Sequence, residues 1–203
     1  LAQRHPDITY EVLSETMIRL ESVSSREAQR EIFVSLFPWL ANVQLVMDTD
    51  DVSLVDVSSH IVLTNLFYLM VKFGDIFHSE LQKAWEQLLA GERVYNARVI
   101  VMYLLHVGLE KRNPSFITYA KRTIVYLGRT AALEMTIDAL IDEITPRGLV
   151  PEKRMDIRQY DKVPRIRMAD IDHVLGAYPK RPEFSRGQLA TVLLVDLAVQ
   201  AGP

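Results

Sequence analysis

The five histidines are the side chains of this sequence best suited to acid–base or metal chemistry, and each stands alone in the chain. They are His5, His60, His78, His106 and His173. His106 interrupts an apolar helical run, where a histidine more often hydrogen-bonds within a core than binds a metal. None of the five has a partner at the spacing of a zinc motif. We therefore expect no metal site.

Acidic residues offer the other possible chemistry. Asp142 and Glu143 are adjacent, so on a helix their side chains diverge by about 100° and do not share a face. We interpret them as solvated acids in a last helical turn. The cluster Asp48, Asp50 and Asp51 lacks the glycine and the distant glutamate of a calcium-binding EF-hand loop. With no nucleophile elbow, phosphate loop or dinucleotide fingerprint present, we expect no catalytic residue, no cofactor and no enzymatic activity.

Basic residues interleaved with tyrosines mark the segment 114–130. The candidate partner-binding residues are Tyr119, Lys121, Arg122, Tyr126 and Arg129. Such a surface would suit an acidic helix, a phosphopeptide or an RNA backbone. In the alternative interpretation, the tyrosines pack between helical repeats and the basic side chains are simply solvated.

The elements that must position these residues are helices of similar length. Four glycines follow apolar helical runs at intervals of 17, 17 and 20 residues: Gly74, Gly91, Gly108 and Gly128. Each interval matches one helix plus a short turn, and we expect each glycine to end its helix in the left-handed conformation. Strand-type alternation is nearly absent. The predicted fold is all-α, an α-solenoid of HEAT/armadillo-like helical repeats.

Local signals set the expected helix boundaries. Ser24 and Glu27 have the spacing of a capping box, which predicts the start of a second helix. Pro38 predicts a kink or break within that helix. Ser58 is the expected N-cap of a third helix. Asn113, followed by a proline, is the expected N-cap of the helix that carries the tyrosines.

The chain divides into three expected regions. Residues 1–145 are stacked helical repeats, residues 146–185 form a proline- and charge-rich connection, and residues 186–203 form a terminal helix that packs on the same solenoid. A short helix is expected within the connection at Met168–Ala177. The chain starts at Leu1 without a signal-like segment, and we expect it to be a fragment of a much larger protein.

Charge and hydropathy restrict the function classes. Residues 1–110 hold 8 Lys and Arg against 15 Asp and Glu, a balance of −7, whereas residues 111–203 hold 15 against 11, a balance of +4. The basic half is too weakly charged to predict nucleic-acid binding. The longest apolar runs, Ile61–Val71 and Val99–Leu109, fall short of the roughly 18–20 residues of a membrane span.

Several separated motifs follow one another along the chain: Pro38-Trp39-Leu40-Ala41-Asn42-Val43, Val62-Leu63-Thr64-Asn65-Leu66-Phe67-Tyr68, Lys72-Phe73-Gly74-Asp75, Asn113-Pro114-Ser115-Phe116, Tyr119-Ala120-Lys121-Arg122, Val125-Tyr126-Leu127-Gly128-Arg129-Thr130 and Leu149-Val150-Pro151. In their order and spacing they resemble the central region of the Furry-type cell morphogenesis proteins, most closely the fungal members.

The resemblance implies a very large, non-enzymatic scaffold of helical repeats. Such proteins act with an NDR-class serine/threonine kinase and its Mob co-activator in cell polarity and morphogenesis. They are cytoplasmic and concentrate at the cell cortex and at sites of polarised growth. A different class of function, an α-solenoid that binds nucleic acid or acidic lipid headgroups through the basic C-terminal half, is the alternative.

Overall fold

The regular elements in the part of the chain that the structure describes are all helices. The computed structural model describes residues 1–48, 55–111, 113–144 and 185–200, together with Ile171, His173 and Leu175. Within these residues the only strand-like pairing is an isolated bridge between Met47 and Val55, so the all-α class is confirmed. The α-helices are α1 (Thr9–Arg19), α2 (Arg26–Leu40), α3 (Val57–Phe73), α4 (His78–Gln87), α5 (Asn96–Lys111), α6 (Pro114–Gly128), α7 (Leu133–Ile144) and α9 (Arg186–Gln200), and the short 3₁₀ helices are η1 (Ala2–Arg4), η2 (Pro6–Ile8), η3 (Leu20–Ser22) and η4 (Arg93–Tyr95).

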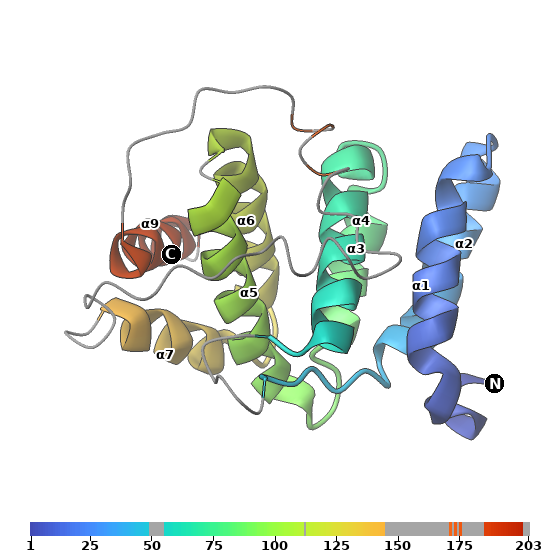
Figure 1. Ribbon diagram of the computed structural model, residues 1–203, viewed down its shortest axis with the longest axis horizontal. Helices are drawn as coiled ribbons and strands as arrows, with labels where there is room; N and C mark the ends of the chain where they lie inside the picture. Colours follow the sequence, from blue (N-terminus) through green and yellow to red (C-terminus); the bar gives the residue numbers. More distant parts are fainter. Residues whose placement is uncertain are drawn as a thin grey trace.

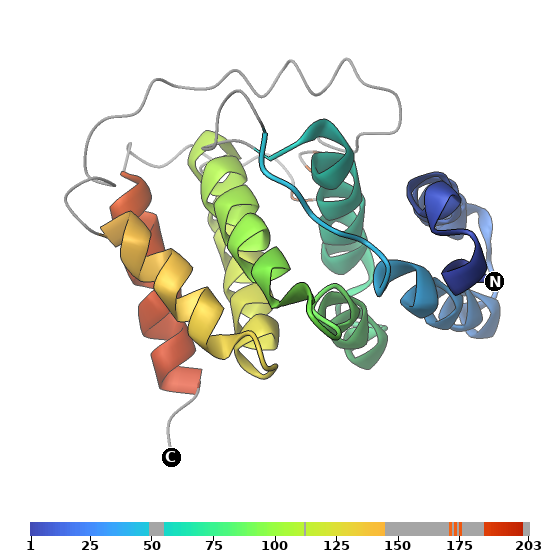
Figure 2. The ribbon, with the colours of Figure 1, turned by 90° about the horizontal axis from the view of Figure 1, so that it is seen from below.

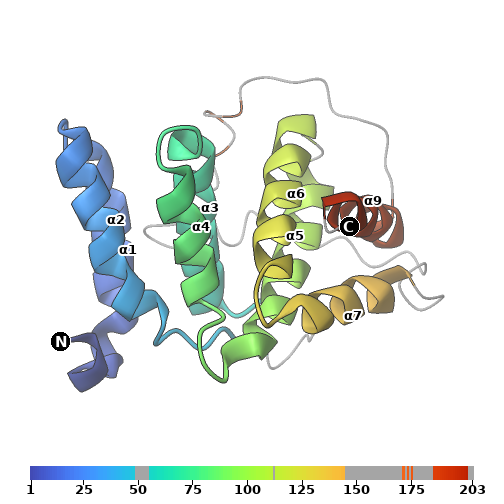
Figure 3. The same ribbon diagram turned by 180° about the vertical axis from the view of Figure 1, so that it is seen from behind.

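The helices are arranged as a row of pairs. From the N-terminal end the pairs are α1 with α2, α3 with α4, α5 with α6, and α7 with α9 (Figure 1). The first three pairs stand roughly upright in this view, whereas α7 lies roughly horizontal at the far end of the row (Figures 1 and 3). The view from below shows the two ends of the chain at opposite ends of the row (Figure 2). A row of stacked pairs is the arrangement expected of a helical-repeat solenoid.

Each helix also packs on the helix two places along the chain, which produces two layers. One layer contains α1, α3 and α5 and continues into α7, and the other contains α2, α4 and α6 and continues into α9. Figure 1 views the first layer from the front and Figure 3 views the second. Every internal pair is therefore covered on both sides by its neighbours.

The core runs along the contacts between successive pairs. Helices α3 and α5 are buried over most of their length, as their nearly uniform apolar composition predicts. Leu66, Trp85 and Leu104 are each at most 1% exposed. The apolar surface that these helices remove from water supplies the main stabilisation of the row.

Two N-caps differ from those expected. The Ser25 side chain, not that of Ser24, accepts a hydrogen bond from the Ala28 amide, and α2 begins one residue later than the capping box implied. At α3 the Asp56 carboxylate, not Ser58, accepts from the amides of Ser58 and Ser59. Serine and aspartate are comparably good caps, so local sequence alone does not select between neighbouring candidates.

Of the kink or break expected at Pro38, the break does not occur, because α2 continues to Leu40. The amide that proline lacks would have bonded to the carbonyl of Val34, one turn earlier. Val34 is 49% exposed, so water can satisfy that carbonyl while the helix runs on for two more residues.

Of the four glycines expected to be left-handed, Gly91 has a positive φ, 66°, and the other three do not. Gly74 follows α3 in a right-handed conformation, Gly108 lies inside α5 and Gly128 is the last residue of α6. A Cβ at Gly108 would meet Leu189 Cδ2 at 2.8 Å, and one at Gly128 would meet Leu197 Cδ1 at 2.4 Å. These two glycines therefore allow α9 to approach α5 and α6 closely.

The connection expected at 146–185 lies outside the described residues apart from four positions. Of these, Ile171 is buried, and Ile171, His173 and Leu175 are helical, at positions within the short helix expected there.

Candidate functional site

Helix α6 carries the candidate partner-binding residues. Its first turn is held by an N-cap, and one of its faces is buried. Asn113 Oδ1 accepts a hydrogen bond from the Ser115 amide at 2.9 Å and so caps the helix as predicted. One face enters the core through fully buried apolar side chains, namely Phe116, Ala120, Ile124 and Leu127. Arg122 and Arg129, seven residues apart, share a face that is directed away from the core, whereas the adjacent Lys121 lies towards α9.

Two of these three cations are engaged by acids of other elements. Lys121 Nζ lies 3.2 Å from Asp196 Oδ1 of α9, and Arg122 Nη1 lies 3.5 Å from Asp75 Oδ1, which follows α3. Asp75 is 85% exposed, so its attraction for Arg122 is strongly screened by solvent. Arg129 is exposed at the end of the helix.

The two tyrosines have different environments. The Tyr119 ring is half-buried and lies beneath the Arg122 guanidinium, 5.4 Å from ring centroid to carbon, in a cation–π contact. Tyr126 is only 2% exposed and meets the His78 ring of α4 edge-on at 5.5 Å. Burial raises the pKa of Tyr126, although Arg122 and Arg129 act in the opposite direction. The structure thus brings Tyr119 and Arg122 into contact, directs Lys121 towards α9 and places Tyr126 between two helices.

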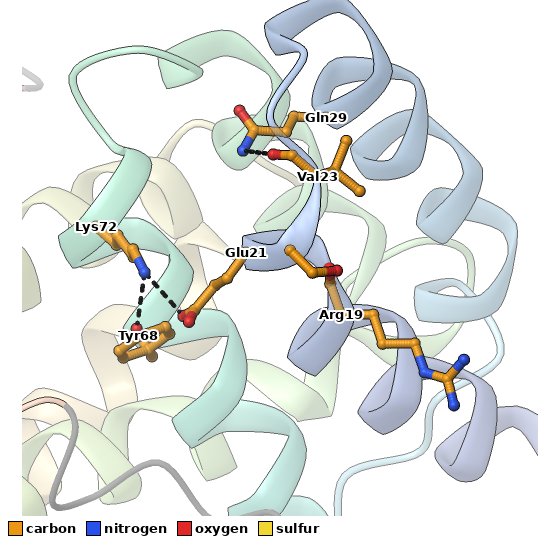
Figure 4. Close-up of polar contacts among 7 residues, drawn as sticks. Arg19, Glu21, Val23, Gln29, Tyr68 and Lys72 are labelled. Atoms are coloured by element: carbon orange, nitrogen blue, oxygen red, sulfur yellow. Dashed lines mark hydrogen bonds and ion pairs between the residues drawn. The ribbon is translucent and has the colours of Figure 1, made fainter.

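A second polar cluster, which the sequence patterns did not reveal, joins the first two helix pairs (Figure 4). Lys72 Nζ lies 3.1 Å from Glu21 Oε1 and donates a hydrogen bond to the Tyr68 hydroxyl at 3.2 Å. Burial lowers the pKa of Lys72, but the contacts with Tyr68 and Glu21 outweigh it and the pKa lies above its ordinary value. Because the amine stays protonated at neutral pH, Lys72 is a structural cation and not a nucleophile.

Similar ion pairs link other neighbouring helices. Arg30 of α2 bonds to Glu80 of α4 at 2.6 Å, and Arg98 of α5 bonds to Asp142 of α7 at 2.8 Å. Burial opposes ionisation of Glu80, yet hydrogen bonds from Ser79 and Arg30 hold its pKa below the ordinary value. Such pairs depend on the stacking of distant helices, so no local spacing could have identified them.

The interpretation of Asp142 and Glu143 as solvated acids is wrong for Glu143 alone. Asp142 pairs with Arg98, yet its side chain remains 52% exposed. Glu143 lies 3.2 Å from Arg186 of α9 in a contact whose side chains are 13% and 5% exposed. The two carboxylates diverge, as adjacent helical residues must, and each ties α7 to a different helix.

Buried titratable groups lie between α3 and α5. The Tyr103 hydroxyl donates to Thr64 Oγ1 at 3.1 Å, and its ring meets that of His60 edge-on at 5.3 Å. Burial, assisted by His106, lowers the pKa of His60 to about 3. His60 is neutral and only 2% exposed, so it cannot reach a substrate. We therefore interpret it as part of the packed core.

Two further classes of site were sought in the described ranges. Among those residues, no group of three or more histidine, aspartate or glutamate side chains is placed to hold a metal ion. The helices within the same ranges include none with the length and apolar character needed to cross a membrane.

The chain is similar to proteins named for cell shape and polarity. It is 26% identical over 188 residues to the cell morphogenesis protein PAG1 of Saccharomyces cerevisiae, which covers 90% of this chain and 7% of that protein. It is 22% identical over 171 residues to the cell polarity protein mor2 of Schizosaccharomyces pombe, which covers 83% of this chain and 8% of that protein. The chain thus spans less than a tenth of the length of these relatives. No solved structure matches it.

Residues 1–176 match the family model described as the cell morphogenesis central region. This match covers most of the chain, and the two fungal relatives agree with the resemblance carried by the separated motifs. The chain belongs to the family of cell morphogenesis proteins that share this central region.

Proposed function

We propose that this chain is a non-enzymatic scaffold segment that supports signalling by an NDR-class kinase and its Mob co-activator in cell polarity and morphogenesis. It acts in the cytoplasm, at the cortex and at sites of polarised growth. The names of the fungal relatives support the role in morphogenesis and polarity. The kinase, the co-activator and the location follow from the family resemblance.

The observation that carries the scaffold proposal is the continuous row of helix pairs, in which neighbouring pairs are joined by ion pairs. Ion pairs join the first pair to the second through Arg30 and Glu80, and the third to the fourth through Arg98 and Asp142. A row linked in this way presents side chains from several helices in a fixed relative arrangement. That property suits a surface that positions other proteins.

The partner contact within this segment is the surface of α6 formed by Tyr119, Lys121, Arg122 and Arg129. The ring of Tyr119 supplies an aromatic anchor that already holds the Arg122 guanidinium in place. Because Asp75 is largely exposed, a carboxylate or phosphate of a partner can replace it beside Arg122. Tyr126 contributes by packing beneath this surface against His78.

The test is a binding experiment with the purified kinase–Mob pair. The variant Tyr119→Ala/Arg129→Glu removes the anchor and reverses the exposed charge while it leaves the Lys121–Asp196 pair intact. We expect binding to fall by at least about tenfold, since a real anchor contributes roughly 2 kcal/mol or more. Arg26→Glu, an exposed change at the start of α2, is the matched control and should bind as the parent does.

Unchanged binding by a folded Tyr119→Ala/Arg129→Glu variant would place the contact elsewhere. A second measurement separates the alternative function. If the chain instead captured RNA or anionic vesicles with an affinity that falls steeply with salt, phosphate recognition by the basic half would be favoured.

A further inference from the structure

Helix α9 has an exposed apolar stripe that nothing within the described residues covers. Val192, Val195 and Val199 are 42%, 56% and 72% exposed, and their spacing of three and four residues puts them on one face of the helix. The exposed side chains beside them, Thr191 and Ala198, are small. The stripe therefore forms a low, apolar surface of the kind that lets a second helix approach closely.

The opposite face of α9 is already buried. Leu189, Leu193 and Leu197 are at most 3% exposed, and the helix contacts α5, α6 and α7. Its two charged residues are also engaged, because Arg186 pairs with Glu143 and Asp196 pairs with Lys121. Helix α9 is thus apolar on two opposite faces, although only one of them has a partner.

The internal helices of the same row show where a helix with two apolar faces is found in this fold. Helices α3 and α5 are apolar on nearly every side, and each lies between the preceding and following pairs. The other end of the row is different, since α1 presents charged side chains at Glu11, Glu15 and Arg19. A helix that is apolar on two faces is suited to the interior of a stack and not to its end.

We propose that the face of α9 formed by Val192, Val195 and Val199 is the docking surface for a further helix pair of the same polypeptide. That pair packs on α7 and α9 as α5 and α6 pack on α3 and α4. The lengths of the relatives support this occupant, because the matched region is only 7% and 8% of PAG1 and mor2. The inference concerns the stacking of the solenoid and is independent of the kinase–Mob proposal.

The test compares residues 1–203 with the same chain extended by its own following sequence, roughly 40–47 residues or one helical repeat. Amide hydrogen exchange is measured along α9 in both. We expect exchange at Val192–Val199 to slow by on the order of tenfold in the longer chain, because covered amides open less often. Val195→Lys in the longer chain should abolish that protection, since it places a charge in the contact.

Val34→Lys is the matched control, because Val34 is 49% exposed and belongs to α2, a helix at the other end of the row (Figure 1). It should leave the protection of α9 unchanged. In residues 1–203 both lysine variants should have the same urea midpoint as the parent, because surface changes of this kind usually leave stability unchanged. Exchange at α9 that is equal in the two chains, or protection that survives Val195→Lys, would overturn the proposal.

Two further outcomes would also overturn it. If residues 1–203 associate with rising concentration and α9 becomes protected on association, the occupant is a second copy of this chain. If the encoded polypeptide ends at Pro203, there is no following pair to dock. Sedimentation over a range of concentrations and the coding sequence decide these two points.

Discussion

Asn96 is the polar residue on which the alignment of the row depends most. Its side chain is fully buried at the start of α5. Nδ2 donates to the carbonyls of Val43 at 2.9 Å and Leu88 at 2.6 Å, while Oδ1 accepts from the Leu45 amide at 2.9 Å. One amide group therefore joins α5 to the link between α2 and α3 and to the end of α4. We predict that Asn96→Ala is among the most destabilising single substitutions in the chain.

The expected magnitude follows from the groups left behind. Asn96→Ala removes the partner of two carbonyls and one amide, all belonging to residues that are at most 3% exposed. An unpaired buried backbone group costs about 1–3 kcal/mol. Because water can enter the space left by the side chain, we take the lower part of that range and expect a loss of about 3–5 kcal/mol. This is a large fraction of the roughly 5–15 kcal/mol that stabilises an ordinary domain.

The assay is urea denaturation followed by circular dichroism, with thermal unfolding as a second measure. A loss of this size corresponds to a drop in Tm of roughly 6–20 °C for a chain of about 200 residues. Asn113→Ala is the matched control, because Asn113 makes one capping bond at the surface of α6 and its loss should cost only about 1 kcal/mol. If Asn96→Ala lost no more stability than Asn113→Ala, the role assigned to Asn96 would be wrong.

Four other substitutions test the packing and the electrostatics of the row. Leu66→Ala and Leu104→Ala should each cost about 2–5 kcal/mol in urea denaturation, because both side chains are at most 1% exposed; a thermal shift equal to the parent's for both would refute this. Burial and the nearby His106 lower the pKa of His60 to about 3, so this side chain stays neutral in the folded protein. In the unfolded chain the same histidine binds a proton below about pH 6.5. The free energy of unfolding should therefore fall as the pH decreases. His60→Gln should remove about 1 kcal/mol of that loss between about pH 7.5 and about pH 5.5, and identical pH profiles for parent and variant would contradict it. Gly91→Ala should cost about 1–2 kcal/mol although nothing lies within 4 Å of the new Cβ, because φ is 66°; an unchanged urea midpoint would show that this turn relaxes freely.

The sequence by itself determined the helical class, the approximate helices and much of the core. Leu66, Trp85 and Leu104 belong to apolar runs with helical spacing, and all three are buried. These features are local, since the hydrophobic pattern of one helix reports how many of its faces are covered. The N-cap at Asn113 was predictable for the same reason, because the capping bond spans only two residues.

The surface of α6 was predictable only in part. Spacing placed Tyr119 and Tyr126 beside the basic residues, and Tyr119 does contact Arg122. Tyr126 is instead covered by His78, which belongs to a different helix pair. Whether a side chain at the border of a helical face is exposed depends on the neighbouring helix, and the sequence of α6 contains no information about that neighbour.

Only the tertiary structure decided which helices meet and which polar groups hold them together. Gly108 and Gly128 look like helix ends in the sequence, yet they provide room for Leu189 and Leu197 of α9. Asn96 looks like the start of a helix, yet it bonds to backbone groups some 50 residues earlier in the chain. The same physical reason applies to the two glycines and to Asn96. Propensity and periodicity act within one helix, whereas close packing and buried hydrogen bonds are set by elements that come together only when the chain folds.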